Sequence, residues 1–324
     1  MTRKSFYLHP VWLASVTGVT AVVLALEAAA RLGGEAGPSP FDAFFREASP
    51  VVLQVFGGLF TALFMAGSFL VYLALRRYRR SSGSGGSGGY GGYGTPAPWG
   101  LRTAYAVFIH WLAIGLTGGI LAGPLLRSWG ADPIVIVIAY YLVHAGVGVA
   151  LIHAWAAKPS GVDLRRMFGP AAPTGTALLR WGLGGWTAAV PVVFLAGVIS
   201  LLLPEELRRS TNPLLLPIAK AEGIMVPILF LFASGLGPLF EEFFFRGFVF
   251  ATLRTRLGFA AAGFVSSFIF AVIHLDPGTL LPLAGLGLVL AYAYEKTGSL
   301  WPAVAIHGLW NAVTFIGLRL LGPE

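Results

Sequence analysis

The chain has 324 residues, of which 56% are apolar and only 11% are charged, and it contains no cysteine. Its mean hydropathy of +0.77 means that one soluble core would not bury all of its apolar surface, so part of the chain should face lipid. The net charge of +8 argues little for nucleic acid, because the basic residues stand in short clusters beside apolar runs, where they anchor topology. The absence of cysteine excludes thiol catalysis, thiolate metal ligands and disulfides.

Apolar runs of about 20 residues, the length that crosses a bilayer as a helix, recur along the sequence. The fold class predicted is all-α, a polytopic transmembrane helical bundle of eight to nine spans. The spans are expected at residues 11–31, 51–75, 103–126, 133–157, 177–203, 224–250, 259–275, 279–295 and 300–321. Residues 213–222 are expected to form a short interfacial helix or a loop.

Composition divides the chain into four parts. Residues 1–80 hold the first two spans, residues 81–98 are a flexible Gly/Ser-rich linker, residues 99–210 hold additional transmembrane helices, and residues 211–324 hold the last spans with the ionisable residues described below. Four arginines between residues 76 and 80 predict a cytoplasmic loop there and hence a cytoplasmic amino terminus. We expect an integral protein of a bacterial cytoplasmic membrane.

Glycines and histidines of the third and fourth spans are interpreted as packing residues. Glycines four residues apart let a neighbouring helix approach closely, and a lone intramembrane histidine is more often hydrogen-bonded within the core than functional. These residues are Gly115, Gly119, Gly123, His110, His144 and His153.

Three ionisable residues stand in the middle of the apolar run 224–250. Each charge at mid-bilayer depth costs on the order of 2.5 to 3.5 kcal/mol, so such residues usually face a cavity or a partner. Glu242 and Arg246 are four residues apart and can neutralise each other on one helix face. Glu241 points elsewhere and is expected to remain as an unmatched carboxylate. One alternative is that all three form an ion-pair cluster that only holds helices together.

Later spans add two histidines and an asparagine. His274 lies near the end of the span 259–275, and His307 and Asn311 share a face of the last span. A poorly solvated carboxylate binds a proton more tightly than one in water, which is the property of a general base. With an imidazole beside it, such a base activates water, and amide or imidazole donors stabilise the oxyanion of an attacked peptide carbonyl. We therefore expect hydrolytic chemistry if these helices adjoin.

The three motifs resemble those of the CAAX-protease and bacteriocin-processing family of glutamic-type intramembrane endopeptidases. They are E-E-x-x-x-R from Glu241, F-x-x-x-H from Phe270 and H-x-x-x-N from His307, and the resemblance covers about residues 224–320. It implies an intramembrane endopeptidase that cuts near the membrane surface with Glu241 as general base. It also implies that His274 holds or polarises the water, that His307 and Asn311 stabilise the oxyanion, and that Glu242 and Arg246 orient the site.

Alternatives to this function remain open. Glu241, His274 and His307 would be the ligands of a metal-dependent variant, with zinc suited to that donor set, although no cofactor is expected. A catalytically inactive scaffold of the same family, acting in immunity or secretion, is the second function considered. A proton-coupled transporter is disfavoured because no repeated halves are evident. The expected partners are the lipid bilayer and a membrane-associated peptide or protein substrate, prenylated or not, and no nucleic acid.

Overall fold

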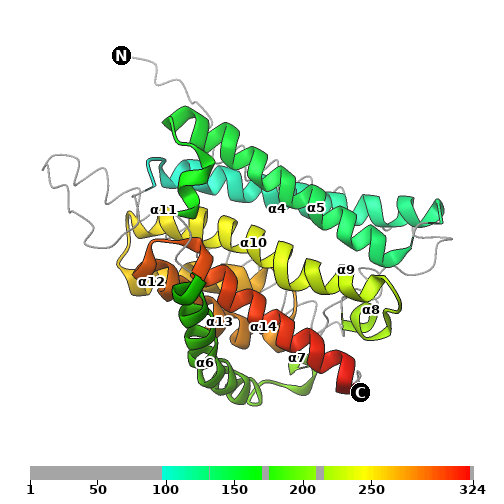
Figure 1. Ribbon diagram of the computed structural model, residues 1–324. Coiled ribbons are helices and arrows are strands. Elements are labelled where there is room, and N and C mark those ends of the chain that lie inside the picture. Colours follow the sequence, from blue (N-terminus) through cyan, green and yellow to red (C-terminus); the bar gives the residue numbers. More distant parts are fainter. Residues whose placement is uncertain (1–96, 131, 170–174, 209–214, 322–324) are drawn as a thin grey trace, which may run out of the picture. The chain divides into compact units, whose positions relative to one another are not determined.

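The computed structural model describes residues 97–130, 132–169, 175–208 and 215–321. Within these residues the chain is 85% helical and has no β-strand, which confirms the all-α fold class. The spans predicted at residues 11–31 and 51–75 lie outside the described residues, and so does the linker 81–98 apart from its last two residues. The chain divides into two compact units, whose helices are labelled in Figure 1.

The first unit contains two long helices among its described residues. They are α4 (Leu101–Ser128) and α5 (Pro133–Ile152), and α5 continues through a π-helical turn, η1 (His153–Ala157), and a 3₁₀ turn, η2 (Lys158–Ser160). Asp132 caps α5 by accepting hydrogen bonds from the first backbone N–H groups, and Pro133 occupies the first turn, where no N–H is needed.

His144 joins α5 to α4 by a reciprocal contact with Trp111. His144 Nε2 lies 2.9 Å from the carbonyl oxygen of Trp111, and Trp111 Nε1 donates to the carbonyl oxygen of His144 at 3.3 Å. The two rings are stacked with their centroids 4.4 Å apart. A Cβ on Gly115 would stand 2.4 Å from His144 Nε2, so this glycine leaves the space that the imidazole fills. The interpretation of Gly115 and His144 as packing residues is confirmed, with a side chain rather than a helix backbone filling the gap.

The second unit contains the remaining described helices. It begins with η3 (Leu164–Phe168), α6 (Gly175–Ser200), α7 (Glu205–Arg208) and α8 (Leu215–Lys220). A continuous rod follows, made of α9 (Met225–Leu231), η4 (Phe232–Leu236), α10 (Gly237–Glu242), η5 (Phe243–Phe250) and α11 (Ala251–Arg254). The unit ends with α12 (Phe259–Val272), η6 (Pro277–Thr279), α13 (Leu280–Thr297) and α14 (Leu300–Leu321).

Five helical segments of the described chain are long and apolar enough to cross a membrane. They are Ile134–Ser160, Gly175–Ser200, Met225–Arg254, Pro277–Thr297 and Leu300–Leu320. Each corresponds to a predicted span, and the predicted spans 103–126 and 259–275 correspond to α4 and α12. α12 has only 14 residues, about 21 Å of helix, which is shorter than the hydrocarbon core of a bilayer. The short helix expected within residues 213–222 is α8.

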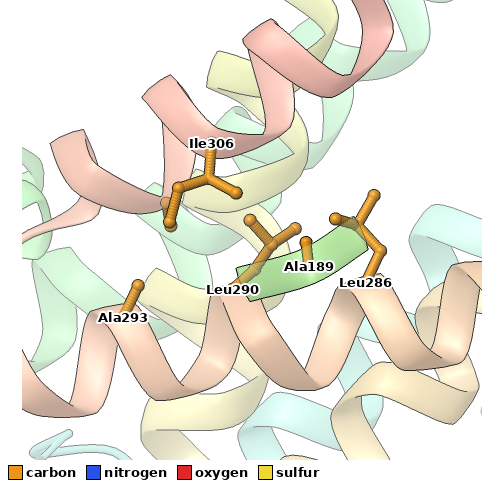
Figure 2. Packing of buried hydrophobic residues seen from close by; sticks show 6 residues of the cluster. Ala189, Leu286, Leu290, Ala293 and Ile306 are labelled. Carbon is orange, nitrogen blue, oxygen red and sulfur yellow. The ribbon is translucent and has the colours of Figure 1, made fainter. Parts of the chain in front are cut away.

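The core of the second unit is a cluster of small and aliphatic side chains where α6, α13 and α14 meet (Figure 2). Leu286 and Leu290 of α13 and Ile306 of α14 are buried against Ala189 of α6. Ile306 also fills the space above Gly185, because a Cβ there would stand 2.2 Å from its Cδ1. Such contacts hold apolar helices together by dispersion, since lipid supplies no hydrophobic force between them. The exposed side of α6 carries large apolar side chains such as Phe194, which is 72% exposed.

Candidate active site

The rod from α9 to α11 carries the acidic motif between two π-helical segments. η4 ends at Leu236, five residues before Glu241, and η5 begins directly after Glu242. A π-helical turn widens the helix, releases carbonyl groups from the usual i to i+4 pattern, and occurs frequently at functional sites. From this part of the rod, Glu241 and Glu242 reach His307 on α14, and Arg246 reaches Gly287 on α13.

Glu242 is the centre of a buried polar network. Its Oε1 accepts a hydrogen bond from Arg246 Nη1 at 2.9 Å and lies 2.9 Å from His307 Nδ1. The Glu242 side chain is fully buried, and those of Arg246 and His307 are 1% and 3% exposed. The predicted ion pair between Glu242 and Arg246 is confirmed, and it extends to a third helix through His307.

Arg246 has two more partners, both from helices beyond its own. Its Nη2 donates to the carbonyl oxygen of Gly287 on α13 at 3.1 Å. Its guanidinium carbon lies 4.6 Å above the ring of Phe270 on α12, a favourable cation–π geometry. Arg246 therefore ties the acidic helix to α12 and α13 at once.

Glu241 is not the unmatched carboxylate that the sequence suggested. Its Oε2 lies 3.7 Å from His307 Nε2, and its side chain is 18% exposed. His307 thus stands between the two glutamates, with Nδ1 facing Glu242 and Nε2 facing Glu241. The prediction failed because it considered only the rod. Glu241 and Glu242 point in different directions from the rod, but the two nitrogens of His307 reach both of them.

His274 lies just after the end of α12, and its ring and that of His307 both contact Phe270. Its Nδ1 is 2.7 Å from the carbonyl oxygen of Phe270, and the ring of Phe270 makes edge contacts with both imidazoles, at 4.7 Å to His274 and 5.7 Å to His307. A carbonyl only accepts, so His274 Nδ1 carries the hydrogen, and in the neutral ring Nε2 is left as a hydrogen-bond acceptor. The next residue, Leu275, has φ +53°, an unusual conformation for a branched side chain.

Asn311 lies one turn after His307 on α14. Its Nδ2 donates to the carbonyl oxygen of Ala233 at 2.9 Å, within the π-helical segment η4. One amide hydrogen is therefore held by the rod, and the other remains available for a second acceptor. α14 approaches η4 closely here, because a Cβ on Gly308 would stand 2.5 Å from the Ser234 carbonyl oxygen.

Sequence reasoning missed three contributors to this site. The carbonyl groups of Gly287 and Ala233 bind Arg246 and Asn311, and a backbone carbonyl leaves no trace in the choice of side chain. The third is Phe270, which was singled out only as part of a motif and which contacts Arg246, His274 and His307.

A metal-binding arrangement is not found in the part of the chain that the structure describes. No group of three or more histidine, aspartate and glutamate side chains there lies close enough to hold an ion, so Glu241, His274 and His307 do not converge as a ligand set. A cavity of about 390 Å³ in the same unit is lined by other residues, among them Phe230, Phe315 and Arg319, and by none of the six predicted site residues.

The comparison with known proteins agrees with the motifs. Residues 223–313 match the sequence model of the family described as type II CAAX prenyl endopeptidase Rce1-like. This segment is similar to that family, which confirms the resemblance inferred from the three motifs. It contains all six predicted site residues.

Two bacterial proteins are similar over a longer stretch. One is YdiL of Bacillus subtilis (strain 168), named as a candidate membrane peptidase, which is 31% identical over 146 residues, 45% of this chain and 57% of that protein. The other is the membrane-embedded CAAX protease MroQ of Staphylococcus aureus (strain USA300), 30% identical over 158 residues, 45% of this chain and 60% of that protein. The matches thus span less than two thirds of either relative. No solved structure matches the chain.

Proposed function

We propose that this chain is a glutamic-type intramembrane endopeptidase, which hydrolyses a peptide bond near the membrane surface with a water activated by Glu241. The observation that carries the proposal is the placement of His307 between Glu241 and Glu242, at 3.7 and 2.9 Å, in a site lined by Arg246. A membrane scaffold needs no such arrangement, because a single buried ion pair would suffice to tie the helices.

Glu241 is the group best suited to accept a proton from water. It is the more exposed of the two glutamates, 18% against 0%, and Glu242 is already engaged by Arg246 and His307. A general base must have an oxygen within reach of water. The role we propose for His274 in this step is to accept a hydrogen bond from water at Nε2, which is the free acceptor of the neutral ring.

The oxyanion of the attacked carbonyl would be stabilised by donors on α14. Asn311 has one amide hydrogen left after its bond to Ala233. With Glu242 ionised, His307 Nδ1 donates to it, so Nε2 becomes a second donor only when the ring is an imidazolium. His307 therefore acts on the oxyanion in its charged form, and that charge is balanced by the Glu242 carboxylate at Nδ1 and by the oxyanion at Nε2.

The substrate we propose is a membrane-associated peptide or protein tail, reached from the bilayer. The family description and the name of the Staphylococcus aureus relative both refer to CAAX substrates, so a prenylated tail is the first to test. We place the protein in a bacterial cytoplasmic membrane with its amino terminus in the cytoplasm, on the strength of the arginines between residues 76 and 80. No metal or other cofactor is part of the proposed mechanism.

The direct test is Glu241→Gln in the full chain, reconstituted in lipid nanodiscs. The amide keeps the shape of the side chain but cannot take a proton, so cleavage of a membrane-anchored reporter peptide should fall to background. Glu222→Gln is the matched control. Glu222 is exposed, and its substitution makes the same chemical change away from the site. A prenylated and an unprenylated reporter are compared in parallel.

Each result has a defined meaning. Loss of cleavage in Glu241→Gln with full activity in Glu222→Gln supports the peptidase. Equal activity in Glu241→Gln and the wild type contradicts the assignment of the base. A wild-type chain that binds the reporter but never cleaves it favours the inactive scaffold.

A further inference from the structure

The backbone of α13 takes part in the active-site network through Gly287. Its carbonyl oxygen accepts a hydrogen bond from Arg246 Nη2 at 3.1 Å, and Arg246 in turn donates to Glu242, which faces His307. Three hydrogen bonds therefore connect Gly287 to the imidazole. A shift of α13 away from Arg246 would be passed along this chain.

The position of Gly287 is fixed by a close contact with α12. A Cβ on Gly287 would stand 2.8 Å from Ser267 Cβ, 3.0 Å from Ser267 Oγ and 3.1 Å from Ser267 Cα. Real side chains do not approach so closely, so any larger residue at 287 must push the two helices apart. Gly287 lies within regular helix and does not have positive φ, so space rather than backbone conformation requires the glycine.

Ser267 contributes to this contact by its small size. The side chain is 1% exposed, and its Oγ has no hydrogen-bond partner within the described part of the protein. By contrast, the neighbouring Ser266 donates to the Gly263 carbonyl at 3.2 Å. An unpaired buried hydroxyl costs stability, so hydrogen bonding gives no account of Ser267, whereas steric fit to Gly287 does.

We propose that Gly287 is a positioning residue, and that its contact with Ser267 holds the Gly287 carbonyl against Arg246 and thereby fixes His307 for catalysis. The catalytic part of this inference rests on the proposed peptidase function. The positional part, that the Gly287–Ser267 contact sets the hydrogen-bonded state of His307, stands apart from it.

The test compares Gly287→Ala with Gly263→Ala in the full chain. Gly263 lies on the same α12–α13 interface, but a Cβ there would make only ordinary contacts of 3.7 to 4.0 Å. A displacement near 1 Å at a catalytic site can cost about 100-fold in rate. We therefore expect Gly287→Ala to lower kcat by about 10- to 100-fold with KM changed by less than about threefold, and Gly263→Ala to change neither.

A second variant makes the contact itself the subject of the test. The double variant combines Ser267→Gly with Gly287→Ala. It adds a Cβ at position 287 and removes the Cβ of Ser267, the atom nearest to the added one. We expect this double variant to recover kcat to within about threefold of the wild type, a coupling that independent sites do not show. If Gly287→Ala does not fold, the double variant alone carries the test, and a folded double variant with low kcat overturns the proposal.

A readout that does not depend on activity separates the two proposals. The imidazole ¹⁵N signals of His307, assigned with His307→Gln, report whether Nδ1 is hydrogen-bonded to Glu242. The positioning proposal expects these signals to change in Gly287→Ala, to stay unchanged in Gly263→Ala and to return in the double variant. Unchanged signals in Gly287→Ala overturn it, whether or not the wild type cleaves a peptide. If the signals change in Gly287→Ala but the wild type cleaves no peptide, the positional part is supported and only the peptidase function is contradicted.

Discussion

Glu242 Oε1 and His307 Nδ1 lie 2.9 Å apart across two helices, and the same oxygen also accepts a hydrogen bond from Arg246. The other oxygen of Glu242 has no protein partner among the described residues. One buried carboxylate oxygen therefore links a cation on its own helix with an imidazole on α14. This oxygen makes Glu242 important for the stability of the bundle, in contrast to Glu241, which is partly exposed and is proposed to act on water.

Glu242→Gln should destabilise the protein strongly. The substitution leaves Arg246 buried without its counter-charge, and breaking a buried ion pair in this way costs about 3 to 5 kcal/mol. The control is Glu295→Gln, which removes a carboxylate that Arg254 binds through Nε and Nη2 where both side chains are 23–25% exposed; water screens the charge left behind, so its loss should be smaller. Denaturation in mixed micelles measures both, and equal losses would contradict the central role of Glu242.

Gly308→Ala should separate α14 from the rod. The added Cβ would stand 2.5 Å from the carbonyl oxygen of Ser234, a backbone atom that cannot turn aside. Gly317→Ala on the same helix is the control, because nothing lies within 4 Å of its Cβ and alanine favours a helix by about 1 kcal/mol over glycine. We expect Gly308→Ala to lower the melting temperature and Gly317→Ala to leave it unchanged or raise it.

The sequence predicted the described helices and the pairing of Glu242 with Arg246, because both depend on side-chain chemistry. Apolar runs fix where helices cross lipid, and the cost of burying Glu242 and Arg246 requires that they meet a partner. The motif spacing also placed His307 and Asn311 on one face of α14, where the structure has them contacting the rod.

The sequence did not predict which groups of the site contact one another. The π-helical segments η4 and η5 flank the acidic residues, and the residues within them, including Gly235 and Gly247, do not distinguish a π-helical turn from an α-helical one. The acceptors at Gly287 and Ala233 are backbone oxygens, which every residue has. Glu241 contacts His307 because the imidazole ring spans the gap between the rod and α14. The spacing of residues along the sequence does not give the distance between two helices.

Asn311→Leu should cost both stability and activity. Leucine has nearly the same shape but no donor, so the Ala233 carbonyl loses its hydrogen bond from Asn311; an unsatisfied buried group costs about 1 to 3 kcal/mol. If the remaining amide hydrogen acts on the oxyanion, kcat should also fall by about 10² to 10³. The control is Thr314→Val, which removes a hydroxyl that bonds only the Trp310 carbonyl of its own helix at an exposed position. A stability loss with unchanged kcat per folded molecule would contradict the oxyanion role.

Leu275 offers a test of backbone strain beside His274. Its φ of +53° is a conformation that costs a residue with a Cβ about 1 to 2 kcal/mol and costs glycine almost nothing. Leu275→Ala removes the partly buried side chain beyond Cβ, and Leu275→Gly removes Cβ as well, so the difference between the two variants reports the cost of holding a Cβ at this φ. We expect the glycine variant to be the more stable by about 1 kcal/mol, the reverse of the order within a helix, as measured by denaturation of both variants under one condition.

If strain in this turn also orients His274, kcat should be higher in Leu275→Ala than in Leu275→Gly even though the alanine variant is less stable. Equal stability of the two variants would show that the turn after His274 relaxes, and the orientation of that imidazole would then have to come from its bond to the Phe270 carbonyl alone.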